Sequence, residues 1–338
     1  MKATLETIAA NTGFSKSTIS RVLNGKAGSS RIPAGTVETI MKEAEKCGYT
    51  TNLIAKRLRS NKSHTIGLLI PSISNPYFAD IASVVISEAK KLGYTTIVTD
   101  TMEDEKEQND SISTMLSKKV DGIITVPCGN DPAFLEHTND KYVPIILVDR
   151  YYENSPLPYV VTNNYQGGYD ATKLLIRNGH KKIACIQGPP SATPNKKRIE
   201  GYMDALKDAG MEDSAIIVGN DFSVQNGYLE TKLLLHGQDR PTAIFALSNT
   251  IGLGTLKAVR EANLSIPNDI SLVSFDNNIY LDYLVPSVTR IGQLTDEMGT
   301  MAVKLLHDSI ANHRIVRSQI ELSPELILRD SVAPLIRQ

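Results

Sequence analysis

Apolar residues recur at helical spacing near the start of the chain, on either side of a glycine. One apolar stripe with the spacing i, i+3, i+4, i+7 consists of Leu5, Ile8, Ala9 and Thr12. Gly13 follows it, and glycine readily takes the positive φ that a tight turn between two helices requires. Ser15 is a good N-cap for a second helix, whose predicted inward side chains are Ile19, Val22 and Leu23. The pattern predicts a helix-turn-helix.

The outer face of the predicted second helix is polar and basic. It consists of Lys16, Ser17, Thr18, Ser20 and Arg21. A helix with such a face fits the major groove of DNA, with its N-terminal residues at the base edges. The same residues also fit a plain helical hairpin with a solvated polar face, so the choice between the two depends on the rest of the chain.

Charge is distributed unevenly along the 338 residues. The first 63 residues hold 11 Lys and Arg against four Glu, a net charge of +7. Because the whole chain carries −1, the remainder carries −8. A basic segment that includes the helix-turn-helix is what binding to a polyanion requires, so the charge favours DNA binding over the hairpin.

A third helix and a candidate hinge follow. The third helix is predicted from Thr36 to Gly48. Beyond it, Asn52 can cap a helix of about two turns that ends near Arg59, too short to be stable alone. Such a segment is a candidate hinge that folds when two chains bind DNA together. A plain basic linker fits its composition equally well.

From Thr65 onward, short apolar runs alternate with amphipathic helices. Strands are predicted at 66–70, 95–99, 122–126, 144–148 and 159–162, and then at 183–187, 215–218, 243–246 and 270–275. Continuous branched runs such as IGLLI and PIILV predict strands covered on both faces, hence parallel sheets with helices on either side. The plan of strand, loop, helix, glycine and strand occurs twice. This repetition predicts two similar α/β lobes with a ligand cleft at the carboxyl ends of their strands.

The end of the sequence is predicted to return to the first lobe. From Val288 the pattern predicts a strand, then a helix at about 295–312, and then a pair of strands near Ile320 and 326–328.

Composition and motifs narrow the function classes. A hydrophobic content of 41% allows large cores in two or three domains. Cys47, Cys128 and Cys185 are widely spaced within apolar runs, which predicts buried reduced thiols and no metal site. Neither a signal-peptide segment nor a run long enough to span a membrane is present, so we expect a cytoplasmic protein.

An enzyme and a transport protein are the two rival classes. Gly252 and Gly254 begin a GxGxxG-like string, but Lys257 occupies the third glycine position, and P-loop, GxSxG and HExxH motifs are missing. We therefore expect no catalytic residues and no cofactor. A solute-binding protein of a two-lobed fold would need a signal peptide and no basic helical head, which disagrees with this sequence.

Several segments, taken in order, are together specific to one protein family. They are TLETIAANTGFSKSTISRVLNG, NLIAKRLRS, SNPYFADI, DGIITVP, PIILVDR, SFDN and PSVTRIGQLTDEMG. The chain resembles the family of bacterial transcription regulators typified by the lactose, galactose and purine repressors, the LacI/GalR family. The resemblance implies an all-α helix-turn-helix N-terminal domain followed by an α/β two-lobed, periplasmic-binding-protein-like (type I) effector domain with parallel sheets.

The resemblance also implies domain boundaries. The DNA-binding domain is expected at 1–50, the hinge helix or linker at 51–63, and the effector-binding and dimerisation domain at 64–338. Within that domain, lobe one is expected at about 64–162 and 292–322, and lobe two at about 163–291 and 323–338.

The family's DNA contacts can be carried over residue by residue. Lys16, Ser17 and Arg21 occupy base-contacting positions, and the capping or phosphate-contacting positions are held by Ser15, Thr18, Ser20 and Asn24. In the hinge, the DNA-contacting positions are Asn52, Ala55 and Leu58. Leu58 resembles the hinge leucine that wedges into the minor groove and kinks the DNA.

Eight residues fall where the family lines its effector cleft. They are Tyr77, Phe78, Asp149, Arg198, Phe222, Ser248, Asp276 and Gln293. Charged and amide groups there can bind ring hydroxyls, and Phe222 can stack on an apolar ring face. Ser248-Asn249 departs from the family, which usually has Asn-Asp at these positions.

Other roles remain open for some of these residues. Asp276 can instead cap the following helix, and Arg198 can form an ion pair on the surface. Tyr77 and Phe78 can equally belong to the core of the first lobe.

We expect a sequence-specific transcriptional regulator, a repressor of carbohydrate-use genes, whose operator affinity is changed by a sugar-like effector in the interlobe cleft. Its expected partners are double-stranded operator DNA, the small-molecule effector and a second copy of the chain in a homodimer. A tetramer also fits, and no membrane partner is expected. The alternative is a regulator that responds to a nucleobase or a protein co-effector.

The substitution Leu58→Ala should weaken binding to the specific operator and spare binding to random DNA. The wedge acts only where DNA is kinked, whereas phosphate neutralisation by the basic residues remains. Fluorescence anisotropy with an operator duplex and a scrambled duplex measures both affinities. Equal losses on the two duplexes would contradict the wedge role.

Overall fold

The computed structural model describes residues 4–23, 27–28, 30–49, 62–237, 239–312 and 317–335. The chain divides into two compact units, residues 1–63 and 64–338. Residues 51–61 of the predicted hinge at 51–63 lie outside the described residues, and so do the predicted DNA contacts Asn24, Asn52, Ala55 and Leu58.

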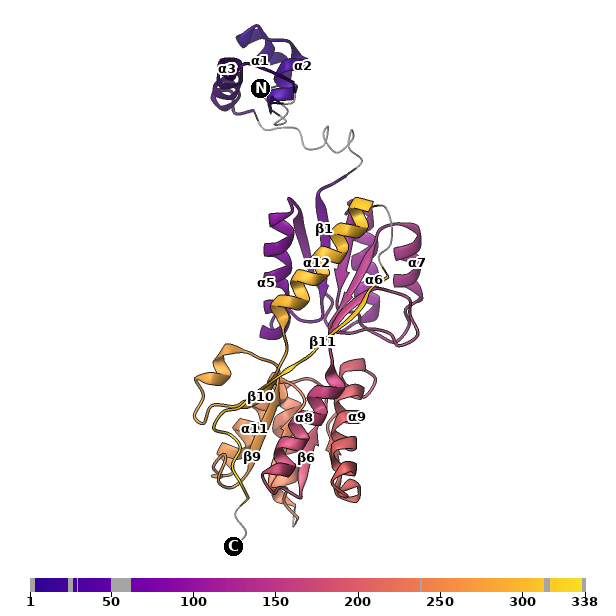
Figure 1. The fold of residues 1–338 in the computed structure, drawn as a ribbon, viewed down its shortest axis with the longest axis vertical. Helices are drawn as coiled ribbons and strands as arrows, with labels where there is room; N and C mark the ends of the chain where they lie inside the picture. Colours follow the sequence, from indigo (N-terminus) through magenta and orange to yellow (C-terminus); the bar gives the residue numbers. More distant parts are fainter. Residues whose placement is uncertain are drawn as a thin grey trace. The chain divides into compact units, whose positions relative to one another are not determined.

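The described part of the first unit contains three short helices (Figure 1), which pack around a small apolar core. They are α1 (Leu5–Thr12), α2 (Lys16–Leu23) and α3 (Ala34–Lys46). Their buried side chains are Ile8, Ile19, Val22, Ile40 and Ala44. Gly13 has φ 71° and ends α1, as its position between the two apolar stripes predicts. The helix-turn-helix prediction is confirmed, and the third helix begins two residues earlier than predicted.

The second unit consists of two lobes, each built on a six-stranded sheet. The first lobe contains β1 (Thr65–Ile70), α5 (Pro76–Lys91), β2 (Thr95–Asp100), α6 (Glu105–Ser117), β3 (Gly122–Thr125), α7 (Ala133–Lys141), β4 (Ile145–Val148), β5 (Tyr159–Thr162), α12 (Thr295–Asn312) and β11 (Gln319–Leu322). Its strand order is β11-β5-β4-β3-β1-β2. Figure 1 shows α12 beside α5 on this lobe, although the two helices are far apart in sequence.

The second lobe repeats this arrangement. It contains α8 (Asn164–Arg177), β6 (Ile183–Ile186), α9 (Thr193–Asp208), β7 (Ile216–Val218), α10 (Val224–His236), β8 (Ala243–Ala246), α11 (Asn249–Glu261), β9 (Ser271–Phe275), β10 (Thr289–Gly292) and β12 (Glu325–Ile327), with 3₁₀ turns at Glu212–Ser214 and Ile279–Asp282. Its strand order is β12-β10-β9-β8-β6-β7. Each strand of one lobe therefore has a counterpart at the same place in the other.

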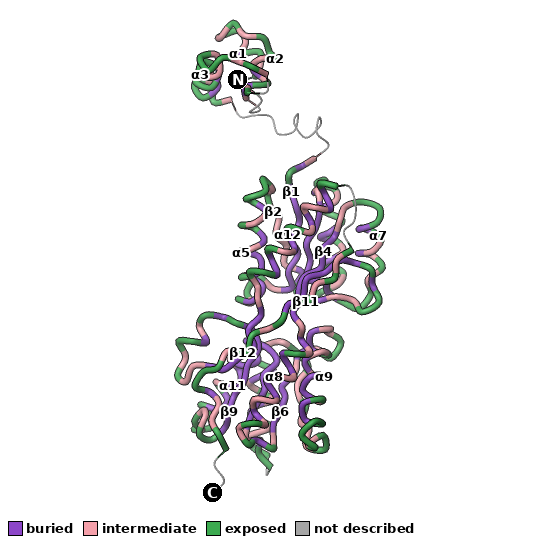
Figure 2. The backbone as a smooth tube through the Cα atoms, in the orientation of Figure 1, coloured by how far each residue is buried: buried purple, intermediate pink, exposed green. Residues whose placement is uncertain are grey.

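The central strands are covered on both faces, as their continuous branched runs predict. Every residue of β1, β3, β4, β5, β6, β8, β9 and β10 is buried. In Figure 2 these strands form the buried centre of each lobe. The ladders are parallel, starting with Thr65 opposite Thr95 in β1 and β2, except that β12 runs antiparallel to β10. The prediction of parallel sheets is confirmed with that one exception.

The predicted pair of strands at the end of the sequence is wrong as a pair. β11 joins the first sheet beside β5, whereas β12 joins the second sheet beside β10. Both strands are short, and each extends the open edge of a different sheet instead of bonding to the other. The chain consequently crosses between the lobes three times, after β5, after β10 and after β11.

The thiol prediction holds for two of the three cysteines. Cys128 and Cys185 are buried, whereas Cys47 is only half-buried, and all three are free. The Cys47 thiol lies at the end of α3 and donates to the Glu43 carboxylate at 3.2 Å. Among the described helices, none is both long and apolar enough to cross a bilayer.

Glycine allows α10 and α11 to pack with their backbones in close approach. A Cβ added at Gly254 of α11 would lie 2.1 Å from the Val224 carbonyl oxygen and 2.5 Å from the Tyr228 nitrogen of α10. No side-chain rotation can relieve a clash with backbone atoms, so any larger residue would push the two helices apart.

The substitution Gly254→Ala should therefore lower the free energy of unfolding by about 3 kcal/mol, as expected for overpacking at a rigid contact. Gly237→Ala is the matched control, because its added Cβ would meet only ordinary contacts at 3.6 Å or more. Urea denaturation followed by circular dichroism measures both variants. Similar unfolding midpoints for the two variants would show that the helix contact is not tight.

Candidate functional site

The start of α2 is fixed by Ser15. Its side-chain oxygen accepts a hydrogen bond from the Thr18 backbone nitrogen at 3.1 Å, which is the N-cap geometry that the sequence predicts. The Ser15 oxygen also lies 2.8 Å from the Ser17 hydroxyl and 2.9 Å from the Thr18 hydroxyl. Three hydroxyls thus gather at the N-terminus of α2, where unpaired backbone N–H groups favour anions such as phosphate.

The residues with predicted base contacts are exposed on α2. Lys16, Ser17 and Arg21 are exposed, whereas Thr18 and Ser20 are half-buried. The Lys16 ammonium lies 2.6 Å from the Glu6 carboxylate of α1, and both side chains are largely exposed. An exposed ion pair of this kind contributes little to stability, so Lys16 can exchange Glu6 for another acceptor.

A cavity of about 930 Å³ lies between the two lobes, at the carboxyl ends of strands from both sheets. The sequence predicts a cleft at this place. All eight residues predicted for the effector cleft line it: Tyr77, Phe78, Asp149, Arg198, Phe222, Ser248, Asp276 and Gln293. Residues that are far apart in the sequence are thus brought together around one space.

Two aspartates occupy equivalent positions in the two lobes. Asp149 directly follows β4, and Asp276 directly follows β9, its counterpart in the second sheet. Both have left-handed backbones, with φ 65° and φ 76°, which is uncommon for residues other than glycine. Such strained conformations persist where the surrounding structure holds them and often occur at binding sites.

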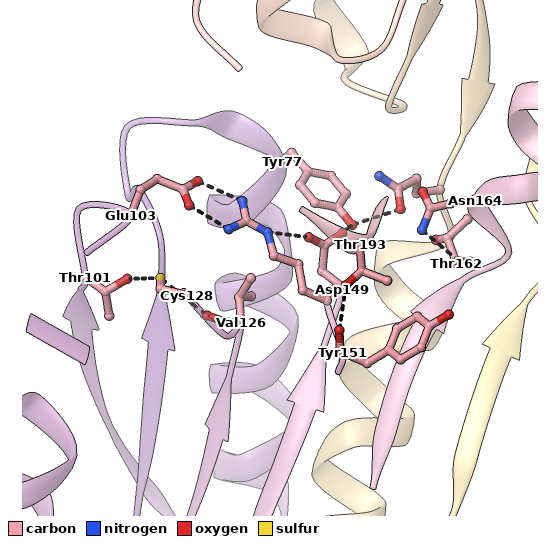
Figure 3. A network of polar contacts seen from close by, with 12 residues as sticks. Tyr77, Thr101, Glu103, Val126, Cys128, Asp149, Tyr151, Thr162, Asn164 and Thr193 are labelled. Carbon is pink, nitrogen blue, oxygen red and sulfur yellow. Dashed lines mark hydrogen bonds and ion pairs between the residues drawn. The ribbon is translucent and has the colours of Figure 1, made fainter. Parts of the chain in front are cut away.

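A chain of hydrogen bonds connects the two aspartates across the lobes. The Tyr77 hydroxyl shares its one proton between two acceptors, Asp149 Oδ1 at 2.6 Å and Gln293 Oε1 at 3.0 Å (Figure 3). The Gln293 side-chain nitrogen in turn donates to Asp276 Oδ1 at 2.7 Å. All four side chains are buried, so the chain of bonds forms a polar floor to the cavity.

Burial changes the pKa values of two groups in this floor, Tyr77 and Asp149. It raises the pKa of Tyr77 well above its ordinary value, and the negative charge of Asp149 adds to the effect. The tyrosine therefore stays protonated and donates to Asp149. Burial also raises the pKa of Asp149, although Arg150, Tyr77 and Arg198 act in the opposite direction.

Arg198 is one of two buried arginines that line the cavity. It is only 3% exposed, so the alternative of a surface ion pair is excluded. Its Nε donates to Asn164 Oδ1 at 2.8 Å, and its guanidinium lies 3.6 Å from the centre of the Phe275 ring. Burial lowers the pKa of Arg198, but the charges of Asp276 and Asp149 oppose that shift.

Asp276 also caps a helix, which is its alternative predicted role, but the helix is not the one expected. Its Oδ2 accepts from the Asn249 backbone nitrogen at 3.0 Å, at the first residue of α11. That helix precedes Asp276 in the sequence and does not follow it. Ser248 is the N-cap of the same helix, where its side chain accepts from the Ile251 nitrogen at 3.2 Å.

The aromatic residues of the site are held by their lobes. Tyr77 and Phe78 belong to the apolar core of the first lobe, as one prediction has it, and they also line the cavity. Phe222 lies against Gly188, where an added Cβ would approach its ring to 2.2 Å. Glycine at 188 therefore makes room for a half-buried ring on the cavity wall.

The sequence interpretation missed one ion pair that lines the cavity. Arg150 is buried, and its two terminal nitrogens donate to the two carboxylate oxygens of Glu103 at 2.6 and 2.7 Å. The position of Arg150 beside Asp149 at a strand end was the available signal. Its partner, 47 residues earlier, gives no local signal.

Asn249 stands at a position where the family usually has aspartate. Its side-chain nitrogen donates to Asn75 in the first lobe at 3.2 Å and to Asn278 at 2.5 Å. It connects the lobes instead of lining the cavity. Among the described residues, no group of three His, Cys, Asp or Glu side chains is arranged to hold a metal ion.

Two family models cover nearly the whole chain. Residues 4–52 match the bacterial regulatory proteins of the lacI family, and residues 63–323 match the periplasmic binding proteins and sugar binding domain of the LacI family. Among curated relatives, the HTH-type transcriptional regulator DegA of Bacillus subtilis is 33% identical over 99% of both chains. The ribose operon repressor of Escherichia coli is 31% identical over 97% of this chain and 99% of its own.

Solved structures show the same fold. The lac repressor dimer bound to operator and an anti-inducer superposes with a TM-score of 0.89 at 24% identity, covering 98% of this chain and all of that one. A LacI family regulator from Enterococcus faecium with bound ribose has a TM-score of 0.73 at 30% identity, over 80% of this chain and all of its own. Those relatives are regulators and not enzymes. With its helix-turn-helix and its two-lobed domain both matched, this chain belongs to the LacI family of DNA-binding transcription regulators.

Proposed function

We propose that this chain is a repressor whose operator affinity is changed by a sugar bound in the interlobe cavity. The observation that supports it best is a set of buried polar side chains, Asp149, Arg198, Asp276 and Gln293, which line one space. Carboxylates accept hydrogen bonds from hydroxyls, and a guanidinium donates to them. Such a set suits a ring with adjacent hydroxyl groups.

Relatives support a sugar as the effector class. One relative is named for the ribose operon, and one solved regulator of the family holds ribose. Another relative, 32% identical over 98% of the chain, is the repressor PurR of Vibrio vulnificus. A nucleobase is the alternative effector class. We favour the sugar because the least exposed groups of the lining, Arg198, Asp276 and Gln293, are charged or amide groups, which suit hydroxyls.

The effector acts on DNA binding through the relative position of the lobes. The hydrogen bonds from Tyr77 to Gln293 and from Asn249 to Asn75 join the two lobes beside the cavity. A ligand that contacts both lobes favours one arrangement of them over another. Ligand and operator then share one equilibrium, and each changes the affinity for the other by the same factor.

We further propose that the chain acts as a homodimer on a palindromic operator in the cytoplasm. A single helix-turn-helix makes few base contacts, whereas two with half-sites about one helical turn apart reach operator-level affinity. The second lobe has an apolar surface that a second copy can cover. Ile279, Tyr283 and Val285 are 72%, 78% and 100% exposed there.

Operator binding should involve two chains and should weaken steeply as salt rises, because basic residues such as Lys16 and Arg21 displace counterions from phosphates. Light scattering of the complex gives the stoichiometry, and anisotropy between about 50 and 200 mM salt gives the salt dependence. The variant Val285→Asp should shift the chain toward monomer. A one-to-one complex or a salt-independent affinity would refute the proposal.

A sugar that binds the cavity should change operator affinity roughly 5- to 150-fold, the usual range of allosteric coupling. Asp276→Asn keeps the side-chain shape but removes the charge, so sugar affinity should fall at least about tenfold. Ligand-free operator affinity should stay within about twofold. Calorimetry with a panel of sugars, followed by operator binding with and without the best ligand, measures all three quantities.

Asp140→Asn is the matched control, since Asp140 is exposed on α7 of the first lobe. It should bind sugar and operator as the parent does. If no sugar binds the parent, or if Asp276→Asn responds like Asp140→Asn, the cavity assignment is wrong.

A further inference from the structure

The charged residues that line the cavity are not balanced. They are three cations, Arg150, Lys196 and Arg198, and five carboxylates, Glu103, Asp149, Glu153, Asp221 and Asp276. Lys196, Glu153 and Asp221 are exposed, which places them at the rim in contact with solvent. The buried charged groups of the lining are two guanidinium groups and two aspartates, whose charges cancel, so the carboxylate of Glu103 makes the sum negative.

Glu103 neutralises Arg150 with a two-point contact. Both terminal nitrogens of the guanidinium donate to the carboxylate, at 2.6 and 2.7 Å, in the parallel geometry that makes such pairs strong (Figure 3). The third nitrogen, Nε, lies 3.7 Å from Asp149 Oδ2. The Arg150 side chain is 11% exposed, whereas that of Glu103 is 47% exposed. The partly exposed carboxylate of Glu103 thus neutralises the charge of the buried Arg150.

The backbone around Glu103 holds it in that position. Met102 and Glu103 are both left-handed, with φ 53° and φ 58°, although neither is glycine. The loop is fixed by the Met102 nitrogen, which donates to Asp100 Oδ1 at 2.9 Å, and by the Asp104 nitrogen, which donates to the Thr101 carbonyl at 2.9 Å. Two successive residues in a rarely populated conformation indicate that the placement of Glu103 is maintained by its surroundings.

The second buried guanidinium is also compensated. Arg198 donates to Asn164 and to the Leu247 carbonyl, and the charges of Asp276 and Asp149 act on it. Both buried cations therefore have carboxylates beside them before any ligand enters. The exposed cation, Lys196, is hydrated and screened, so it attracts a ligand only weakly.

We propose that this cavity takes an uncharged sugar and rejects the phosphate ester of the same sugar, and that Glu103 is the residue that determines this specificity. This inference rests on the proposed function of the cavity as a sugar site. Hydroxyl groups of a neutral sugar can bind the floor without disturbing its ion pairs. A phosphate group would have to displace Glu103 from Arg150 or lie beside the carboxylates that line the cavity, and like charges brought together oppose binding.

Calorimetry with matched pairs of ligands tests the specificity in the parent protein. Suitable probes are ribose and ribose 5-phosphate, glucose and glucose 6-phosphate, and fructose and fructose 6-phosphate. For any sugar that binds, the ester should bind more than about tenfold more weakly, because placing like charges together costs more than one decade of affinity. This comparison requires no variant.

The role of Glu103 is tested by Glu103→Gln, which keeps the side-chain size but frees the charge of Arg150. In this variant the preference for the neutral sugar over its ester should fall by about tenfold or more. The matched control is Glu107→Gln, which removes the same charge from an exposed position on α6 nearby and leaves the contact of Glu103 with Arg150 in place. The control should keep the preference of the parent within about twofold. Affinity for the neutral sugar and the melting temperature show whether each variant retains the folded floor.

The outcomes separate the two proposals. If the ester binds as tightly as its parent sugar or more tightly, the specificity inference is wrong, while the sugar site stands. If both variants reduce the preference equally, general charge and not the pairing of Arg150 controls it, which overturns the role of Glu103. If neither member of any pair binds, the proposed function fails, and this inference fails with it.

Discussion

A buried chain of hydrogen bonds between two carboxylates, a phenol and an amide connects the lobes of this regulator. Asp149, Tyr77, Gln293 and Asp276 occupy the cavity floor, and each satisfies a polar group that would otherwise be buried without a partner. An unpaired buried polar group is costly, so removing any member affects the rest. The floor can therefore exchange partners with a ligand, but it cannot simply lose them.

The repeated topology of the two lobes explains why the site has this form. Asp149 and Asp276 follow equivalent strands in sheets of the same strand order, so both carboxylates reach the space between the lobes. The two sides differ in their cations. The first lobe places Arg150 beside its aspartate and covers it with Glu103, whereas the second lobe supplies Arg198 from the helix α9. An approximate symmetry of the backbone thus supports an asymmetric set of charged groups around the cavity.

The helix-turn-helix follows simpler physical rules. Its core consists of few apolar side chains, its turn depends on Gly13, and its second helix begins with a serine cap. The first 63 residues carry a net charge of +7 and the remaining residues −8, which separates attraction to a polyanion from recognition of a small ligand. The sequence divides these two tasks between two segments of opposite net charge.

Local pattern by itself determined the helix-turn-helix, the central strands and the division of charge, because periodicity, caps and branched runs act over only a few residues. Family resemblance placed eight residues of the cavity. Only the tertiary structure decided which side chains meet: Tyr77 and Gln293 are 216 residues apart, and Arg150 and Glu103 are 47 apart. It also decided that β11 and β12 belong to different sheets and that Asn249 joins the lobes. Contacts over such separations depend on how the chain crosses between the two lobes, and no local sequence signal records that path.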